Sequence, residues 1–222
     1  MALTRPLLAA LAFTSFVTGM GAFITVGTVE PLADGLGITN AQSGTLLSYY
    51  AFAYAFSSPI LVALTGQVAR RLVLALGLTL FTVASAMGAL APDFSILAAS
   101  RALAGIGAGV VTPVSAAIVA LLAPPEKRAR MLAVVFMGVT LAQVIGVPAG
   151  SWLAYTYGWR VALGMVAVLS LPALALVIAF VPRGLPFQAT NLRDLGHVLR
   201  NPTMMLATLF TASFISSIFL LY

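Results

Sequence analysis

The feature that most constrains this chain is an apolar run over residues 99–124 that contains a single charge, Arg101. Between Arg101 and Glu126 the chain contains no other charged residue. At about 1.5 Å per helical residue the run is long enough to cross a bilayer core of roughly 30 Å. A guanidinium near the bilayer centre costs about 2.5 kcal/mol or more, so it persists where it faces protein or a water-filled cavity. The run therefore predicts a membrane-spanning helix packed into a bundle with a polar interior.

The overall composition extends this conclusion to the whole chain. Of its 222 residues 61% are hydrophobic and only 7% are charged, whereas soluble domains carry about 25% charged residues. The apolar runs do not alternate with polar residues, as the strands of a membrane barrel do. The chain has no cysteine and one histidine, His197, so we expect no metal site and no cofactor. Composition thus predicts an all-α membrane protein.

Charged and turn-forming residues mark the ends of six long apolar segments. We expect these to form a bundle of six spanning helices, with Thr39 or Asn40 as the N-cap of the second. The expected spans cover residues 6–29, 41–64, 72–90, 99–124, 131–154 and 161–181.

The character of the chain changes after Pro182. A short amphipathic helix is expected over residues 192–199, where leucines recur at helical spacing and polar residues take the other face. A seventh apolar run starts after Pro202 and reaches Tyr222 without a polar cap. We therefore expect a six-helix domain at 1–182, a cytoplasmic linker at 183–200, and a partial seventh helix at 201–222 that begins a truncated second half.

The basic residues predict the orientation of the chain. If the N-terminus is cytoplasmic, nine of the eleven Lys and Arg residues fall in inner segments, and the outer loops hold only Arg160. This asymmetry follows the positive-inside rule, and it explains the net charge of +6 better than nucleic-acid binding does. The prediction is a multi-pass protein of the cytoplasmic (inner) membrane. The nine are Arg5, Arg70, Arg71, Lys127, Arg128, Arg130, Arg183, Arg193 and Arg200.

Four of the expected helices, the first, second, fourth and fifth, carry a polar or small face. One interpretation is that these faces line a transport cavity together with Arg101. The other is that the threonine hydroxyls bond their own backbone and the glycines only allow close packing. Arg101 has a similar alternative, since its long stem could reach the outer interface. The expected cavity residues are Arg101, Thr18, Thr25, Tyr50, Tyr54, Thr112 and Gln143.

Several stretches resemble the N-terminal half of a major facilitator superfamily transporter, in particular the drug–proton antiporter branch and its arabinose-efflux-like permeases. Gly105 and Gly109 belong to a stretch similar to the family's fourth-helix signature. Gly146, Pro148 and Gly150 match the Gly-x-Pro-x-Gly of the fifth-helix antiporter signature. The matching stretches are LLSYYAFAYAFSSPILVAL at 46–64, RALAGIGAG at 101–109, GVTLAQVIGVPAGSWLA at 138–154 and YGWR at 157–160.

The chain departs from the family pattern in two places. The loop after the second helix usually reads close to Gly-x-x-x-Asp-Arg-x-Gly-Arg-Arg, but here Gly66 stands at the aspartate and only Arg70 and Arg71 remain. In similar permeases the first helix often has an acidic residue in its middle, where this chain has Ala22. The resemblance therefore implies a transporter without the usual latching aspartate and without a carboxylate proton carrier in this half.

The resemblance implies a secondary transporter, an efflux permease for small drug- or sugar-like solutes that works by alternating access. Its partners would be the lipid bilayer, a small-molecule substrate, protons as a coupling ion, and a missing C-terminal half. That second half would cover an interdomain face including Gly146 and Gly150, so we expect an incomplete copy of a protein about twice as long. The alternative is a half-length channel or scaffold that acts as an oligomer. Enzyme function is not expected, because no histidine or lysine lies in a span.

Overall fold

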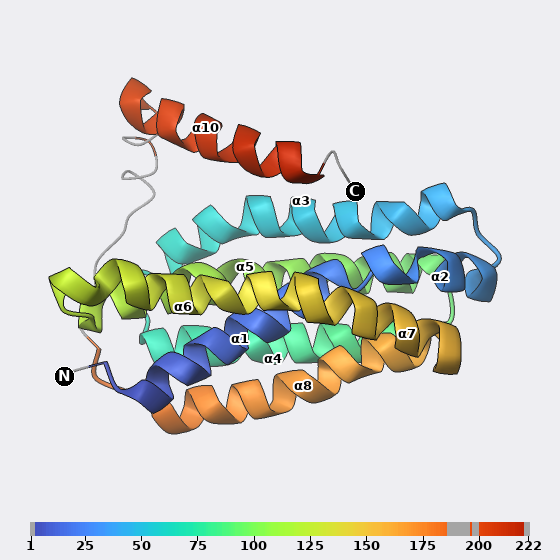
Figure 1. The fold of residues 1–222 in the computed structure, drawn as a ribbon, viewed down its shortest axis with the longest axis horizontal. Coiled ribbons are helices and arrows are strands. Elements are labelled where there is room, and N and C mark those ends of the chain that lie inside the picture. The colour runs from blue at the N-terminus through green and yellow to red at the C-terminus, as the bar shows by residue number, and fades with distance from the viewer. Residues whose placement is uncertain (1–2, 186–195, 197–199, 220–222) are drawn as a thin grey trace.

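The structure, a computed structural model, describes residues 3–185, 196 and 200–219. Its regular elements in these ranges are all helical, and six helical segments are long and apolar enough to cross a membrane. This confirms the predicted all-α bundle (Figure 1). The six are α1 (Arg5–Phe23), α3 (Asn40–Leu64), α4 (Arg70–Ala89), α5 (Phe94–Leu122), the segment Pro125–Tyr157 and α8 (Trp159–Phe180).

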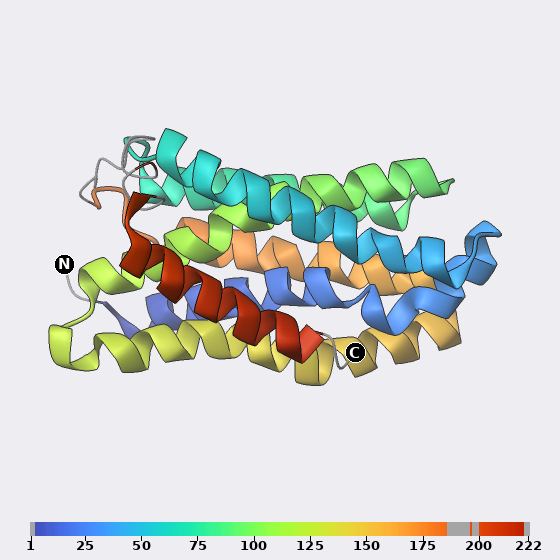
Figure 2. The same cartoon turned by 90° about the horizontal axis from the view of Figure 1, so that it is seen from above.

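The long helices run side by side along the long axis of the molecule (Figures 1 and 2). Helix α5 packs closely against α3 on one side and α4 on the other, and α8 packs against α4. Helix α1 contacts both α8 and the segment Pro125–Tyr157. Helix α3 and the segment Pro125–Tyr157 are the least buried spans. They therefore expose a larger share of their residues than the other spans do.

The first span does not form the single helix expected over residues 6–29. Helix α1 ends at Phe23, and the chain continues through the 3₁₀ turn η1 (Val26–Thr28) into the short helix α2 (Val29–Leu36). The β-branched residues that follow α1 have modest helix propensity, and Gly27 has less. An added Cβ at Gly27 would crowd the Val147 carbonyl oxygen. The break therefore lets the backbone of η1 approach a neighbouring span.

The fifth span is also not one regular helix, as was expected over residues 131–154. It consists of the 3₁₀ turn η2 (Pro125–Lys127), α6 (Arg128–Leu141), a π-helical turn η3 (Ala142–Gly146) and α7 (Val147–Tyr157). Pro148 lies in the first turn of α7 and has no backbone N–H to offer the preceding turn. A wider turn before the proline accommodates the missing donor.

Four small residues spaced four apart line the side of this span that packs against α1. An added Cβ at Gly138 would overlap the Ala12 carbonyl oxygen, and one at Gly146 or Gly150 would press on the side chain of Met20 or Ile24. The expectation that Gly146 and Gly150 lie on an interdomain face without a partner was therefore wrong. The four residues, all buried, are Gly138, Ala142, Gly146 and Gly150.

The other helix ends lie within a few residues of the predicted positions, apart from α5, which begins five residues early. Thr39, one of the two N-cap residues predicted for the second span, caps α3 through a reciprocal capping box with Gln42. Asp93 caps α5, accepting a hydrogen bond from the Ile96 amide at 2.9 Å, and starts that helix at Phe94. The seventh run forms α10 (Pro202–Phe219). The amphipathic helix predicted over residues 192–199 falls almost entirely outside the described residues.

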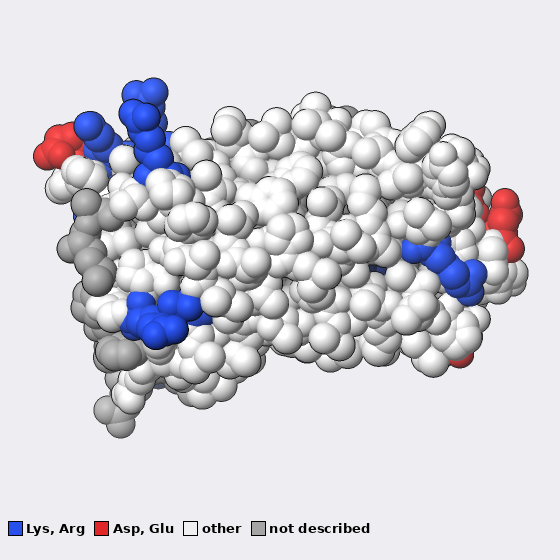
Figure 3. Space-filling view, turned by 90° about the horizontal axis from the view of Figure 1, so that it is seen from below, with Lys and Arg blue, Asp and Glu red and all other residues white. Residues whose placement is uncertain are grey.

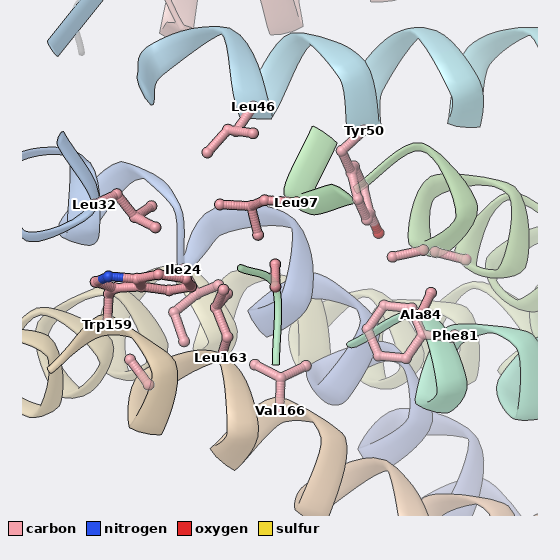
Figure 4. Packing of buried hydrophobic residues seen from close by; sticks show 14 of the residues in the cluster. Ile24, Leu32, Leu46, Tyr50, Phe81, Ala84, Leu97, Trp159, Leu163 and Val166 are labelled. Carbon is pink, nitrogen blue, oxygen red and sulfur yellow. The ribbon is translucent and has the colours of Figure 1, made fainter. Parts of the chain in front are cut away.

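The apolar core at one end of the bundle joins four helical elements. Ile24 and Leu32 from either side of the α1 break meet Trp159 and Val166 of α8, and Phe81 of α4 packs in the same cluster (Figure 4). All five side chains are nearly inaccessible to solvent. The broken first span is therefore anchored by packing on α8 and α4.

The charged side chains gather at the two ends of the molecule and leave an uncharged band between them (Figure 3). Arg5, Arg70 and Lys127 stand at helix starts on one end, whereas Asp93 and Arg160 stand at helix starts on the other. This is the distribution that a bundle crossing a bilayer requires, because charges are costly inside the hydrocarbon region.

The glycine contact between α6 and α1 generates a stability prediction. Gly138→Ala should destabilise the protein by about 1–3 kcal/mol, because overpacking a close backbone contact forces the helices apart. The control is Gly44→Ala in α3, where an added Cβ meets nothing within 4 Å. Thermal unfolding in detergent measures both variants. An unfolding temperature for Gly138→Ala equal to that of Gly44→Ala would contradict the packing described.

Candidate functional site

Arg101 lies inside the bundle. Its side chain is 3% exposed, and its Nη1 donates a hydrogen bond to the Gly21 carbonyl oxygen at 3.1 Å. That carbonyl belongs to α1, so the guanidinium joins α5 to the first span and does not extend along its own helix to the outer end. The structure thus places the charge between helices.

The position of Gly21 explains why its carbonyl is available. Helix α1 ends at Phe23, and the last turn of a helix leaves carbonyl groups without intrahelical partners. A cation is also favoured at a helix C-terminus, where the peptide dipoles carry partial negative charge. Arg101 therefore caps the broken end of α1, and the buried positive charge is offset by backbone dipoles.

Tyr50 of α3 supplies the second contact of Arg101. The guanidinium carbon lies 5.5 Å from the centroid of the Tyr50 ring, within the range of a cation–π interaction. The Tyr50 hydroxyl donates to the Thr18 carbonyl oxygen at 3.3 Å, and Figure 4 shows the ring pointing from α3 into the bundle. Tyr50 and Arg101 therefore both donate hydrogen bonds to backbone carbonyls of α1, and the two acceptor residues are three positions apart in that helix.

Two glycines of α5 allow this arrangement. An added Cβ at Gly105 would overlap the Tyr50 carbonyl oxygen, and one at Gly109 would press on the Tyr54 carbonyl oxygen and the Ser57 hydroxyl. Small residues at such spacing let helix backbones touch in a membrane. The two glycines thereby set the separation at which the tyrosine ring meets the arginine.

The predicted threonine face of the first span forms hydrogen bonds with its own backbone. The Thr18 hydroxyl donates to the carbonyl oxygens of Thr14 and Ser15, and the Thr25 hydroxyl donates to that of Ala22. Both side chains are almost inaccessible. Their hydroxyl protons are thus used by their own helix, and what Thr18 offers to the site is its backbone carbonyl.

Two further predicted residues lie next to this cluster and one does not join it. The Tyr54 ring stacks near that of Tyr50, with centroids 6.4 Å apart, and its side chain interacts with that of Thr112. Both Tyr54 and Thr112 are half-buried. Gln143 is half-buried in the π turn η3, and no hydrogen bond joins it to Arg101 in the described part of the chain.

The arginine pair predicted in the loop before the third span stands at the first turn of α4. Arg70 is buried and Arg71 is half-buried. Both lie at the basic end of the bundle, far along α4 from the Arg101 cluster. The structure therefore separates this loop motif from the intramembrane site.

Sequence reasoning missed the residues through which the first span joins the site. Gly21 lies on the small, polar face of the first span, but nothing in the sequence marked its carbonyl as the acceptor of Arg101. Gly138 and Ala142 were not singled out, although with Gly146 and Gly150 they form a four-residue repeat of small side chains that could have been found by spacing. Within the described ranges, no group of three residues suited to bind a metal occurs.

Comparison with known proteins shows the family to which this chain is related. The sequence profile of the Major Facilitator Superfamily matches residues 11–222. The inner membrane transport protein YdhP of Escherichia coli is 31% identical over 222 residues, which cover 100% of this chain and 57% of that protein. A chloramphenicol resistance protein of Streptomyces lividans is 34% identical over 206 residues, which cover 91% of this chain and 53% of that protein.

Solved structures show the same fold at lower identity. A peptide transporter POT in complex with sulfate matches with a TM-score of 0.71 and 20% identity, covering 92% of this chain and 45% of that one. The proton:xylose symporter XylE matches with a TM-score of 0.67 and 19% identity, covering 80% of this chain and 44% of that one. This chain spans about half the length of these relatives, and it belongs to the Major Facilitator Superfamily.

Proposed function

We propose that the chain serves as the N-terminal half of a secondary active transporter, an efflux permease that exports small drug- or sugar-like solutes by alternating access. Its relatives support this assignment, because they include an inner membrane transport protein and chloramphenicol efflux pumps. A C-terminal half would cover the open surface of α3 and of the segment Pro125–Tyr157, which are the least buried spans. The relatives do not favour a half-length channel or scaffold.

The observation that carries this proposal is the buried guanidinium shared by three helices. Arg101 binds the end of α1 and the ring of a tyrosine from α3. Arginine stays protonated in proteins, so Arg101 does not carry a proton itself. It lowers the affinity of its surroundings for protons or cations, and any shift of α1 or α3 against α5 changes the contacts that offset its charge.

The same proposal includes orientation and domain organisation. The basic end of the bundle faces the cytoplasm, so the N-terminus and the Lys127 turn lie inside the cell. Residues 1–182 form the transmembrane unit, residues 183–200 a cytoplasmic linker, and residues 201–222 the start of the second half. Support comes from the basic residues at the end of the bundle where α1, α4 and α6 start and from the positive-inside rule.

Substitution of Arg101 tests the function. In the transporter that contains this chain, Arg101→Ala removes both the charge and the hydrogen bond to Gly21, so it should abolish transport at normal membrane abundance. Arg101→Lys keeps the charge but loses the planar fork, and should leave partial activity. Substrate flux in vesicles, normalised to inserted protein, measures both. Wild-type flux in Arg101→Ala would remove Arg101 from the mechanism.

Tyr50 offers a finer test of the same cluster. Tyr50→Phe keeps the ring over Arg101 and loses only the hydrogen bond to Thr18, so we expect at most a severalfold loss of flux. Tyr50→Ala also loses the cation–π contact and the buried ring, worth about 3–5 kcal/mol in packing, and should abolish transport. Tyr49→Phe is the control, because Tyr49 is 44% exposed, whereas Tyr50 is buried. Equal flux in Tyr50→Phe and Tyr50→Ala would show that the ring is not required.

Cysteine labelling tests the orientation. The chain has no cysteine, so Lys127→Cys and Asp34→Cys each create one unique thiol in it. An impermeant thiol reagent added to intact cells should label Asp34→Cys and spare Lys127→Cys until the membrane is opened. Labelling of both thiols in intact cells would refute the proposed orientation.

A further inference from the structure

The turn between α5 and α6 carries a dense basic surface. Every residue from Pro124 to Arg130 is exposed. Three cations occur within four positions, one at the end of this turn and two in the first turn of α6, and Glu126 is the acidic residue beside them. We call Lys127, Arg128 and Arg130 the basic corner.

The protein itself does not neutralise the basic corner. In the described part of the chain none of its three side chains makes a hydrogen bond or an ion pair. The first turn of α6 contains no acidic residue, although a helix N-terminus favours anions and disfavours cations. The repulsion among these cations and the direction of the helix dipole therefore both favour an anion at this corner.

The neighbouring helices place this corner at the level of lipid headgroups. Helix α5 ends at Leu122, and the apolar part of the next span begins with Met131 and Leu132, which pack against the core. The basic corner thus lies between two helices where both enter the hydrocarbon region. Helix α1 starts at Arg5 and α4 at Arg70 on the same end, which makes the potential there more positive.

We propose that the basic corner binds the headgroups of anionic phospholipids in the surrounding bilayer. The guanidinium groups of Arg128 and Arg130 suit bidentate binding of phosphate oxygens, and Lys127 adds a mobile point charge. A bound phosphate would also satisfy the positive end of the α6 dipole. The lipid would stabilise the start of a span that is little buried in the bundle. This role is independent of which solute is transported.

Native mass spectrometry of the purified protein in a neutral detergent tests the proposal. The protein is titrated with phosphatidylglycerol or with phosphatidylcholine, and the bound lipid is counted. Each basic residue near an anionic lipid surface contributes about fivefold in affinity. Replacing all three residues, as Lys127→Gln, Arg128→Gln and Arg130→Gln together, should therefore lower the preference for phosphatidylglycerol by at least about tenfold after screening by salt.

Two matched variants control for charge and for folding. Arg128→Lys keeps the charge and should retain most of the preference for phosphatidylglycerol. Glu126→Gln removes a nearby carboxylate that repels anionic lipid, and should raise that preference. All these positions are exposed, and an unchanged elution profile confirms that each variant is folded. An unchanged lipid preference in the triple variant would overturn the proposal. So would displacement of the lipid by millimolar inorganic phosphate, because it would identify a soluble anion as the occupant.

Discussion

Direct contact between helix backbones is the constraint on which this bundle depends. Burial of apolar side chains from water does not drive helices together inside a bilayer, so close packing must do so. Gly105 brings α5 against α3, and Gly107 brings it against Gly77 of α4. Because α5 is held so closely on both sides, the guanidinium of Arg101 has a fixed position from which to reach the end of α1.

The buried arginine shows how a membrane protein accommodates a charge without a counterion from a side chain. None of the helices α1 and α3 to α8 contains an acidic residue, so the compensation comes from the Gly21 carbonyl and the Tyr50 ring. Both are weaker partners than a carboxylate, and the Arg101 Nε–H has no hydrogen-bond partner in the described part of the chain. A site of this kind responds to small displacements, because each contact supplies a substantial part of the compensation.

Much of the fold was predictable because charges and caps mark where helices leave the membrane. Thr39 fixes the start of α3 by a capping box that its side chain makes locally, whereas the cap at Asp93, which starts α5 five residues before the predicted position, was missed. The break after Phe23 was not predictable in the same way, since it depends on the contact of Gly27 with a distant span. The site also has one part that the sequence identifies and one part that it does not. Arg101 was identifiable as a lone charge, but its acceptor is a backbone carbonyl, which every residue possesses and no sequence pattern marks.

The π turn at Ala142–Gly146 sets the rotational phase of the second half of the fifth span. An α-helix advances about 100° per residue, so regular α-helical winding of the same residues, without the wider turn, would rotate everything beyond it by about that angle. Gly150 would then turn away from Ile24, and Trp152 and Tyr155, now exposed, would turn with it. The wider turn thus acts as a phase correction that keeps both halves of the span in register with α1.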